Sequence, residues 1–294
     1  MIETLDLDIF HSLHAWFPFF IGRLRMKKVV TIYDLFVLTD KEFFAKRYPL
    51  GGLFRTYFTA LTRRAVTGAD LIVTVSEYSA KRIVELFPDA EGKIEVIYCA
   101  AGLERQDPAV ASPEKAKGYL LYVGNCRSYK NIPLLIRGFV EYLRRRPESD
   151  MGLVIAGNDH CPHIRELAGR LGILERIRFI LDPPDADLSE LYARAVAFVM
   201  PSREEGFGIP VLEAMNAGIP VIVSDTHALV EVAGDAALVF DRSRPEALAD
   251  AICQITDDDS LRRRLTERGH RRVEQFSWRR NAARLRECYA KLGK

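Results

Sequence analysis

The sequence predicts an α/β protein of two domains, each built around a parallel, doubly wound sheet. Three observations support this prediction. Short, apolar, β-prone runs alternate with helical stretches almost throughout the 294 residues, and the loops between them are short, as in parallel sheets with crossover helices. Residues 102–118 break the alternation with two prolines and no apolar period. We therefore expect the linker between the two domains in that segment.

The first series of elements precedes this linker. The expected strands cover residues 7–10, 28–32, 71–75 and 93–97, and the expected helices residues 53–67 and 77–87. The first helix is indicated by apolar residues at helical spacing, among them Phe54, Tyr57 and Leu61. Ser76 is a suitable N-cap for the second helix.

The second series follows the linker. The expected strands cover residues 119–123, 151–155, 177–180, 196–200, 221–223 and 237–240, and the expected helices residues 133–145, 162–171, 188–194, 210–216 and 245–255. Residues 261–294 are helical and basic, with ten Arg against two Glu within residues 262–286. Such a helix can bind anionic lipid or nucleic acid. The alternative, which we prefer, is a solvated face balanced by the three aspartates at residues 257–259.

Composition excludes several classes of protein. Hydrophobic residues make up 48% and charged residues 28% of the chain, as in globular proteins. The net charge of +2 gives no global field for nucleic acid. The apolar runs are too short to span a bilayer, and the acidic N-terminus does not resemble a signal peptide. The five scattered cysteines form no C-x-x-C pair, so we expect reduced thiols in a cytoplasmic protein.

The most informative segment is residues 201–220, where an expected strand leads through a loop into a helix. Pro210 suits the first turn of that helix. Glu205 would lie in the loop, and Glu213, eight positions later, about one turn into the helix. Ligands bind at such strand ends in open α/β sheets, and carboxylates there accept hydrogen bonds from sugar or ribose hydroxyls. A glutamate near a helix N-terminus is also favoured by the helix dipole without any function.

Glycines support the functional interpretation of this segment. Gly206 and Gly208 let the backbone approach a ligand and expose N–H donors at the start of the helix. A second element, residues 124–131, also follows a strand and opens a helix. Its Gly124 turn and Lys130 make a workable diphosphate site, although the spacing is not that of a P-loop. A lysine before a helix is common, but both loops follow strands of one sheet.

Other candidates remain open. His160 and His163 match no structural zinc pattern, so no metal site is predicted. His11 and His14, just after the first strand, have either a structural or an acceptor-side role. Residues 14–28 join aromatic to basic side chains. This segment is either a contact with a membrane surface or lipid acceptor, or a loop with a core-facing helix turn.

Several of these segments together resemble family 4 of the retaining glycosyltransferases, which have the GT-B architecture of two Rossmann-like domains. The resemblance covers nearly the whole chain, and its most specific part is the pair of glutamates at residues 205 and 213. The matching segments are residues 30–35, 73–79, 121–124 with 130–131, 205–213, 231–237 and 276–278.

This resemblance implies an activity. The chain would transfer a hexose from a nucleotide diphosphate sugar to a glycan or lipid-linked acceptor with retained configuration, in cell-surface polysaccharide synthesis. It would need neither a metal nor another cofactor. The leaving diphosphate would help to take the acceptor proton, so the protein supplies positioning and charge stabilisation. The expected location is the cytoplasm, or the inner membrane surface through a peripheral contact, and no nucleic acid partner is expected.

The resemblance also implies site residues. Glu205 and Lys130 would be catalytic. Lys130 would hold the diphosphate, Glu205 and the amides of residues 206–208 the sugar, and Glu213 the ribose. The base would lie near Gly157 and near Asp182 and Pro183. The full donor set is Gly124, Asn125, Arg127, Lys130, Gly157, Asp182, Pro183, Glu205, Gly206, Phe207, Gly208, Ile209 and Glu213. The acceptor-side set is His11, His14, Tyr33 and Asp34.

Two departures from the family motivate alternatives. Tyr33 stands where the family usually has His, and a phenol does not titrate near neutrality. The N-terminal domain is also shorter than in the family, so we expect it to be incomplete and to self-associate through an exposed sheet edge. The expected domains are residues 1–108, 109–275 and a C-terminal helix, 276–294, that packs back toward the first. The alternative function is a truncated, non-catalytic nucleotide-sugar-binding or interaction protein.

Overall fold

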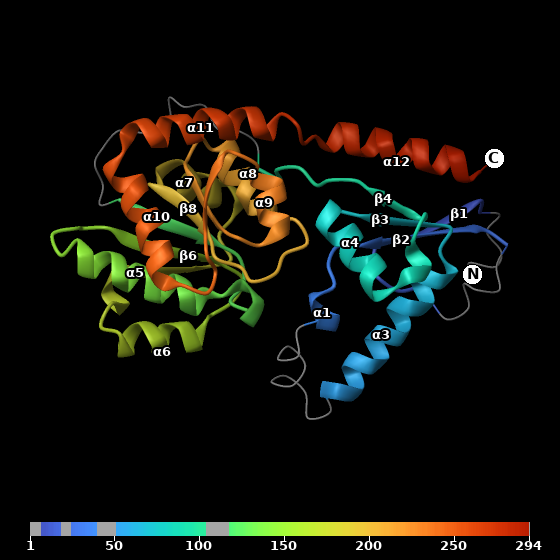
Figure 1. The fold of residues 1–294 in the computed structure, drawn as a ribbon, viewed down its shortest axis with the longest axis horizontal. Helices are drawn as coiled ribbons and strands as arrows, with labels where there is room; N and C mark the ends of the chain where they lie inside the picture. Colours follow the sequence, from blue (N-terminus) through green and yellow to red (C-terminus); the bar gives the residue numbers. More distant parts are fainter. Residues whose placement is uncertain (1–6, 19–24, 40–50, 104–117, 294) are drawn as a thin grey trace. The chain divides into compact units, whose positions relative to one another are not determined.

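The computed structural model describes residues 7–18, 25–39, 51–103 and 118–293, and the chain forms two compact units. Unit 1 comprises Met1–Cys99 and Phe276–Lys294, and unit 2 comprises Ala100–Gln275 (Figure 1). Each unit contains one parallel sheet, which confirms the predicted α/β class with two parallel sheets. Most of the expected linker, residues 104–117, lies outside the described residues.

The sheet of unit 1 has the order β1-β2-β3-β4, with all neighbours parallel. Its strands are β1 (Ile9–Ser12), β2 (Lys27–Ile32), β3 (Leu71–Thr74) and β4 (Ile94–Val96). The accompanying helices are α1 (Phe36–Thr39), α3 (Gly51–Gly68), α4 (Glu77–Leu86), the 3-10 turn η3 (Pro88–Ala90) and α12 (Trp278–Leu292). The predicted first strand is two residues too early, because Ile9 is the first residue in register with β2 and Leu7 is exposed. Ser76 caps α4 as predicted, accepting a hydrogen bond from Ser79 N.

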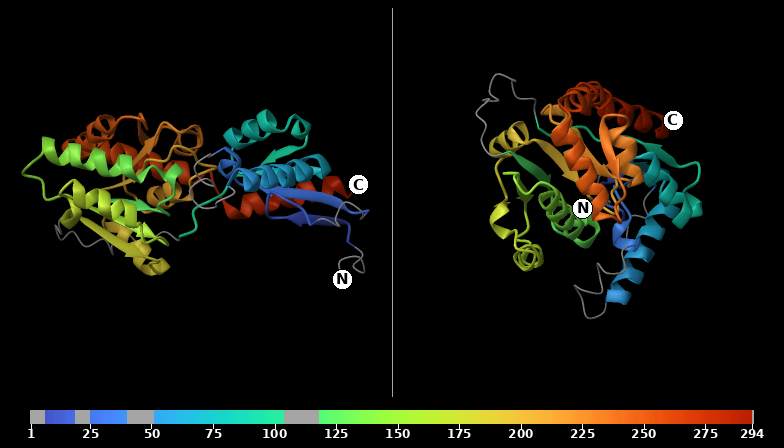
Figure 2. Two further views of the ribbon diagram at one scale, coloured as in Figure 1. Left: turned by 90° about the horizontal axis from the view of Figure 1, so that it is seen from below. Right: turned by 60° about the vertical axis from the view of Figure 1, so that its left-hand side comes forward.

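The last helix of the chain, α12, belongs to unit 1. Asn281 Nδ2 donates a hydrogen bond to the carbonyl of Tyr98, and Arg284 forms an ion pair with Glu95 on β4. At the other edge of the sheet, Tyr289 contacts β1 through a hydrogen bond to His11. Both Figure 1 and Figure 2 show α12 beside the strands of this sheet. The helix therefore crosses from β4 to β1.

The sheet of unit 2 has the order β10-β9-β8-β5-β6-β7, again parallel throughout. Its strands are β5 (Tyr119–Val123), β6 (Gly152–Gly157), β7 (Ile177–Leu181), β8 (Ala197–Met200), β9 (Val221–Ser224) and β10 (Ala237–Phe240). Its helices are α5 (Ile132–Arg145), α6 (Pro162–Arg170), α7 (Asp185–Arg194), α8 (Ile209–Asn216), α9 (His227–Ala233), α10 (Pro245–Asp257) and α11 (Asp259–Val273), with 3-10 turns η5 (Ser128–Lys130) and η6 (Leu174–Arg176). Every strand and helix predicted for this unit is present. The short helix α9 is an additional element that was not predicted.

Several basic residues of α11 are held by contacts within unit 2. Arg272 donates to the carbonyls of Glu231 and Val232 at the end of α9. Arg264 and Arg262 pair with Asp258 and Asp259 at the start of α11. These contacts are those expected of a paired surface face, because each guanidinium neutralises a carboxylate or satisfies a carbonyl at a helix end.

Two of the five cysteines are not thiols. Cys126 and Cys161 form a disulfide, whereas Cys99, Cys253 and Cys288 are free. The prediction of five reduced thiols is therefore wrong for this pair. The two residues are 35 positions apart in the sequence and meet because they follow the adjacent strands β5 and β6. Sequence spacing alone does not reveal such a pairing.

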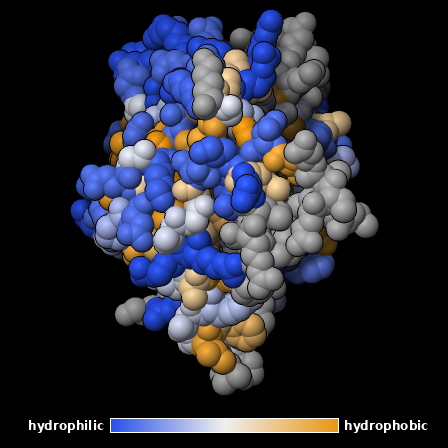
Figure 3. Space-filling view, turned by 90° about the vertical axis from the view of Figure 1, so that its right-hand side faces the viewer, coloured by the Kyte–Doolittle hydropathy of each residue, from blue (hydrophilic) through white to orange (hydrophobic). Residues whose placement is uncertain are grey.

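Unit 1 exposes apolar side chains on the N-terminal half of α3. Leu53 is 66% and Tyr57 49% exposed. Figure 3 shows apolar surface at the lower end of the molecule, where this half of α3 lies in Figure 1. In the part of the chain that the structure describes, no helix combines the length and apolar character needed to cross a membrane.

Candidate functional site

The strand order of unit 2 reverses between β5 and β8. From β5 the chain proceeds outward to β6 and β7, then returns to β8 on the other side of β5 and proceeds to β9 and β10. The loops after β5 and β8 therefore leave neighbouring strand ends in opposite directions, which is where ligands bind in open α/β sheets. These loops are residues 124–131 and 201–208, the two segments singled out from the sequence.

Lys130 and Glu205 join these two loops through an ion pair. Lys130 ends η5, and its Nζ lies 2.7 Å from Glu205 Oε1 in the loop after β8. The side chains are only 12% and 9% exposed. Ser202 Oγ donates a second hydrogen bond to the same oxygen at 2.6 Å. A largely buried ion pair needs such additional hydrogen bonds, because both charges have lost most of their hydration.

A buried polar network fixes the loop that carries Glu205. The carbonyl of Ser202 accepts hydrogen bonds from Ser224 Oγ at 2.5 Å and from Thr226 Oγ1 at 2.6 Å. All three residues are at most 2% exposed. Ser224 ends β9, so the network ties the loop after β8 to the end of the next strand. These hydrogen bonds hold the backbone of the loop at Ser202, three residues before Glu205.

Asn131 ties the two loops together. Its backbone is left-handed, with φ of 56°, and its side-chain amide donates to the carbonyls of Pro201 and Arg242, both at 3.1 Å. Asn tolerates this conformation better than most residues. Arg203 N also donates to the carbonyl of Tyr129 at 2.7 Å. The residue next to Lys130 thereby fixes the lysine loop against the glutamate loop.

The start of α8 supplies backbone donors and the second glutamate. Gly208 has φ of 107°, and an added Cβ would lie 2.7 Å from Leu229 Cδ2, so glycine is required there. Pro210 occupies the first turn of α8, as predicted. Glu213 Oε2 accepts a hydrogen bond from Tyr192 OH at 3.0 Å, and the backbone N–H of Gly102 donates to the same carboxylate. Burial raises the pKa of Glu213, while these two hydrogen bonds oppose that shift.

The loops after β6 and β7 complete this edge of the sheet. Gly124 N donates to the carbonyl of Ala156, and Asp182 N to the carbonyl of Gly157. An added Cβ at Gly157 would lie 2.1 Å from Gly124 O, so only glycine permits this approach of the two backbones. Asp182 is left-handed, with φ of 48°, and Pro183 follows it before α7. The donor-side candidates therefore come from four strand ends at one edge of unit 2.

The acceptor-side candidates all lie in unit 1. His11 is half-buried, with Nδ1 2.5 Å from Tyr289 OH and Nε2 2.7 Å from Thr31 Oγ1, and burial lowers its pKa. His14 is exposed and stacks on Trp16, with ring centroids 6.0 Å apart. Tyr33 and Asp34 follow β2, and Tyr33 is 47% exposed. Of the aromatic and basic segment 14–28, residues 19–24 lie outside the described residues.

Sequence reasoning missed several residues that build this site. They are Tyr192, Ser202, Ser224 and Thr226, and Asn131 was noted only as part of a matching segment. Ser224 ends an apolar strand, and Ser202 and Thr226 each come two residues after one, so a survey of short polar residues near strand ends would have found them. Tyr192 gives no such signal, because it occupies an ordinary helical position in α7.

A metal centre is not evident in the described part of the chain. Among residues 7–18, 25–39, 51–103 and 118–293, no group of three or more His, Cys, Asp and Glu side chains is arranged to hold a metal ion. His160 and His163 flank Cys161, whose sulfur is engaged in the disulfide.

Comparison with known proteins agrees with this geometry. The family model described as "Glycosyl transferases group 1" matches residues 104–272, and that described as "Glycosyltransferase Family 4" matches residues 1–105. The O-antigen chain mannosyltransferase B of Escherichia coli is 32% identical over 283 residues, which cover 92% of this chain and 71% of that protein.

Solved structures share the fold. A sucrose-phosphate synthase from Thermosynechococcus elongatus superposes with a TM-score of 0.80 at 20% identity, covering 99% of this chain and 75% of that one. Anabaena HepE in complex with UDP and glucose superposes with a TM-score of 0.75 at 17% identity, covering 91% and 72%. This chain is short relative to its homologues. Its sequence and its two parallel α/β units show that it belongs to glycosyltransferase family 4, the glycosyl transferases group 1, with the GT-B fold.

Proposed function

We propose that this glycosyltransferase transfers a hexose from a nucleotide diphosphate sugar to a hydroxyl of a glycan or lipid-linked acceptor, with retained configuration and without a catalytic metal. The observation that carries the proposal is the largely buried Lys130–Glu205 pair between the loops after β5 and β8, with Glu213 on the helix that follows the second loop. This arrangement offers a cation for a diphosphate and two carboxylates for hydroxyl groups.

Each group has a distinct role in the proposed complex. The Lys130 ammonium binds the donor diphosphate, with Arg127 on the same loop as a second cation. Glu205 and the amides of residues 206–208 bind hydroxyls of the transferred hexose. Glu213 accepts hydrogen bonds from the ribose hydroxyls, since each of its oxygens has a further lone pair beyond the contacts to Tyr192 and Gly102.

The proposed reaction uses these placements. The bond from the sugar C1 to the diphosphate oxygen breaks while the acceptor oxygen bonds to C1 on the same face. The acceptor proton passes to the leaving diphosphate oxygen. Negative charge therefore develops on the diphosphate, beside Lys130 and Arg127. Cationic groups fixed in advance at that position stabilise the transition state more than they stabilise the substrate.

The comparisons support a nucleotide sugar and a polysaccharide product. The Anabaena protein was solved with UDP and glucose, and the E. coli relative is named as an O-antigen mannosyltransferase. We propose that this chain likewise extends a cell-surface glycan.

Calorimetric titration with UDP, GDP and ADP tests the donor site. We expect micromolar binding of one nucleotide, and its loss in Lys130→Ala and in Glu213→Ala. Lys81→Ala, an exposed lysine on α4 of unit 1, is the matched control and should bind as the parent does. Binding of none of the three nucleotides would contradict the proposal.

Turnover separates an enzyme from a non-catalytic binding protein. Release of the nucleoside diphosphate from the matching sugar nucleotide, lost in Glu205→Ala, is expected of the enzyme. Donor binding without any hydrolysis or transfer, with glycan and lipid-linked acceptors supplied, would favour the non-catalytic alternative. Addition of EDTA should leave the rate unchanged.

A peripheral membrane contact is the proposed route to a lipid-linked acceptor. Leu13 is 58% and Trp16 43% exposed in the loop after β1, and Arg25, Lys27 and Lys28 follow in the chain. Apolar and cationic groups together favour anionic lipid surfaces. We expect co-flotation with vesicles containing phosphatidylglycerol, reduced in Leu13→Ser/Trp16→Ser. Equal flotation of parent and variant would refute a contact through this loop.

A further inference from the structure

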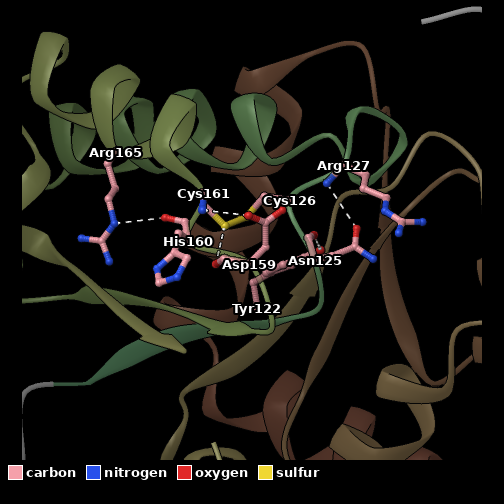
Figure 4. Close-up of a disulfide and its surroundings, with 8 residues drawn as sticks. All are labelled: Tyr122, Asn125, Cys126, Arg127, Asp159, His160, Cys161 and Arg165. Carbon is pink, nitrogen blue, oxygen red and sulfur yellow. Dashed lines mark hydrogen bonds between the residues drawn. A yellow bond between two sulfur atoms is a disulfide. The ribbon is translucent and has the colours of Figure 1, made fainter. Parts of the chain in front are cut away.

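The disulfide joins two loops at the edge of unit 2 that carries the donor-side candidates. Cys126 lies in the loop after β5, and Cys161 immediately precedes α6, after β6. Their Cα atoms are 5.6 Å apart, and the residues are 3% and 2% exposed. Figure 4 shows the two sulfurs bonded between Asn125 and Arg127 on one side and Asp159 and His160 on the other. Cys126 therefore lies in the same loop as Lys130, four residues before it.

Cys161, the cysteine that follows β6, is held by several backbone hydrogen bonds. Asp159 Oδ1 accepts a hydrogen bond from Cys161 N at 3.1 Å, and Cys161 takes a left-handed backbone conformation at the N-cap of α6. The carbonyl of Cys161 accepts from the amides of Ile164 and Arg165 in the first turn of that helix. Cys161 is therefore fixed by the helix it begins.

The lysine loop, residues 124–131, is held to its surroundings at several points. At its start, Tyr122 OH donates to the carbonyl of Asn125 at 2.7 Å. At its end, Asn131 binds the carbonyls of Pro201 and Arg242. Between these points, Arg203 N of the loop after β8 donates to the carbonyl of Tyr129 at 2.7 Å, and Lys130 Nζ pairs with Glu205. The second half of the loop is therefore held by the loop after β8. Within the loop, Arg127 N donates to Asn125 Oδ1 and Lys130 N to Arg127 O. The disulfide at Cys126 links the first half covalently to the loop after β6.

We propose that Cys126 and Cys161 are positioning residues of the donor diphosphate site. Their disulfide holds the segment that carries Arg127 and Lys130 in the geometry that binds the diphosphate, and reduction to two thiols weakens donor binding. This inference rests on the proposed function of Lys130. Pre-organisation raises affinity because the bound geometry is already adopted in the free protein, so its loss lowers the affinity.

The redox step is a two-electron exchange. A dithiol reductant attacks one sulfur, the Cys126–Cys161 bond breaks, and the mixed disulfide resolves to two protein thiols and the cyclic disulfide of the reductant. Two electrons and two protons pass from the dithiol to the protein. The site would then be more competent in an oxidising than in a reducing environment.

Mass spectrometry first establishes the bond. Denatured protein treated with iodoacetamide should gain three labels, on Cys99, Cys253 and Cys288, and five labels after reduction. Five labels without reduction, from protein exposed to an oxidant such as oxidised glutathione, would overturn the proposal.

Calorimetry then measures the effect on binding. The probe is the nucleoside diphosphate that binds best among UDP, GDP and ADP. We expect reduction by dithiothreitol to weaken its binding by about tenfold, which corresponds to about 1.4 kcal/mol, and reoxidation to restore it. Cys126→Ser/Cys161→Ser should show the weakened affinity whether or not reductant is present. Cys253→Ser, a free cysteine on α10, is the matched control and should respond as the parent does.

The outcomes separate this inference from the proposed function. Unchanged binding in Lys130→Ala would refute the donor site itself. Loss of binding in Lys130→Ala, with equal affinity of the oxidised and reduced parent, would refute only the role of the disulfide. A thermal melt of each form distinguishes general unfolding from a local effect, because a folded, reduced protein with weakened binding supports the positioning role. A reductant effect that persists in the double serine variant would contradict it.

Discussion

The phenol of Tyr192 donates a hydrogen bond to Glu213 Oε2 at 3.0 Å, from a side chain that is only 1% exposed. The ring packs against Phe198 on β8, with centroids 5.8 Å apart. Helix α7 thereby orients the carboxylate that is proposed to bind ribose on helix α8. The contact connects α7, which precedes β8 in the sequence, with α8, which follows it.

Removal of this hydroxyl should weaken ribose recognition. In Tyr192→Phe the carboxylate loses a donor worth about 1.5–3 kcal/mol, so we expect weaker binding of the cognate nucleoside diphosphate. Its 2′,3′-dideoxy counterpart should bind parent and variant equally. Tyr142→Phe, which loses the hydrogen bond to Ser149 elsewhere in unit 2, serves as the control. An equal loss for both nucleotides would indicate a structural role instead.

Substitutions of the Lys130–Glu205 pair should affect the free energy of unfolding and the transferase activity differently. Lys130→Met leaves a carboxylate that is 9% exposed without its cation, and breaking a buried pair costs about 3–5 kcal/mol. Lys130→Met/Glu205→Gln removes that charge and should regain much of the stability in urea unfolding, but no transferase activity. Recovery of activity in the double variant would show that Lys130 does not act on the substrate.

Glu213 should make stability depend on pH. Burial raises its pKa above the ordinary 4.5, so the folded protein binds this proton at a higher pH than the unfolded chain. The ionised carboxylate therefore lowers stability at neutral pH, and this cost is relieved as the pH falls through the raised pKa toward 4.5. As the pH is lowered from 8 to 4, the melting temperature of the parent should rise relative to that of Glu213→Gln. A difference independent of pH would contradict the prediction.

The stabilities of Asn131→Gly and Asn131→Ala should differ by the free-energy cost of a left-handed backbone at this position. Asn131→Gly keeps the left-handed conformation and loses the hydrogen bonds to Pro201 and Arg242. Asn131→Ala loses the same bonds and adds about 1–2 kcal/mol for the left-handed backbone. Urea unfolding should therefore rank the stabilities as parent, then glycine, then alanine. An alanine variant as stable as the glycine variant would show that the loop relaxes.

Local sequence was sufficient for the strands of unit 2, for its α-helices except α9, and for the two site loops. Apolar runs bounded by glycine and proline marked the strands, because a parallel sheet buries both of its faces. Pro210 and Gly208 marked the start of α8, because each fits one backbone geometry there. The strand at residues 7–10 was displaced because the register with β2, rather than local hydrophobicity, decides where an edge strand begins. The seven-residue helix α9 is too short to show a period.

By itself, then, the sequence determined the α/β class, the parallel sheets, and the candidates Lys130, Glu205 and Glu213 in the loops and the helix start that follow two strands. Only the tertiary structure decided what holds those side chains. Ser224 and Cys161 reach their partners because the crossover topology brings separate strand ends to one edge of a sheet, and Tyr192 reaches Glu213 because helices α7 and α8 both pack beside β8. Local propensity is encoded within a few residues, whereas these contacts depend on the order of the strands, which no short segment contains.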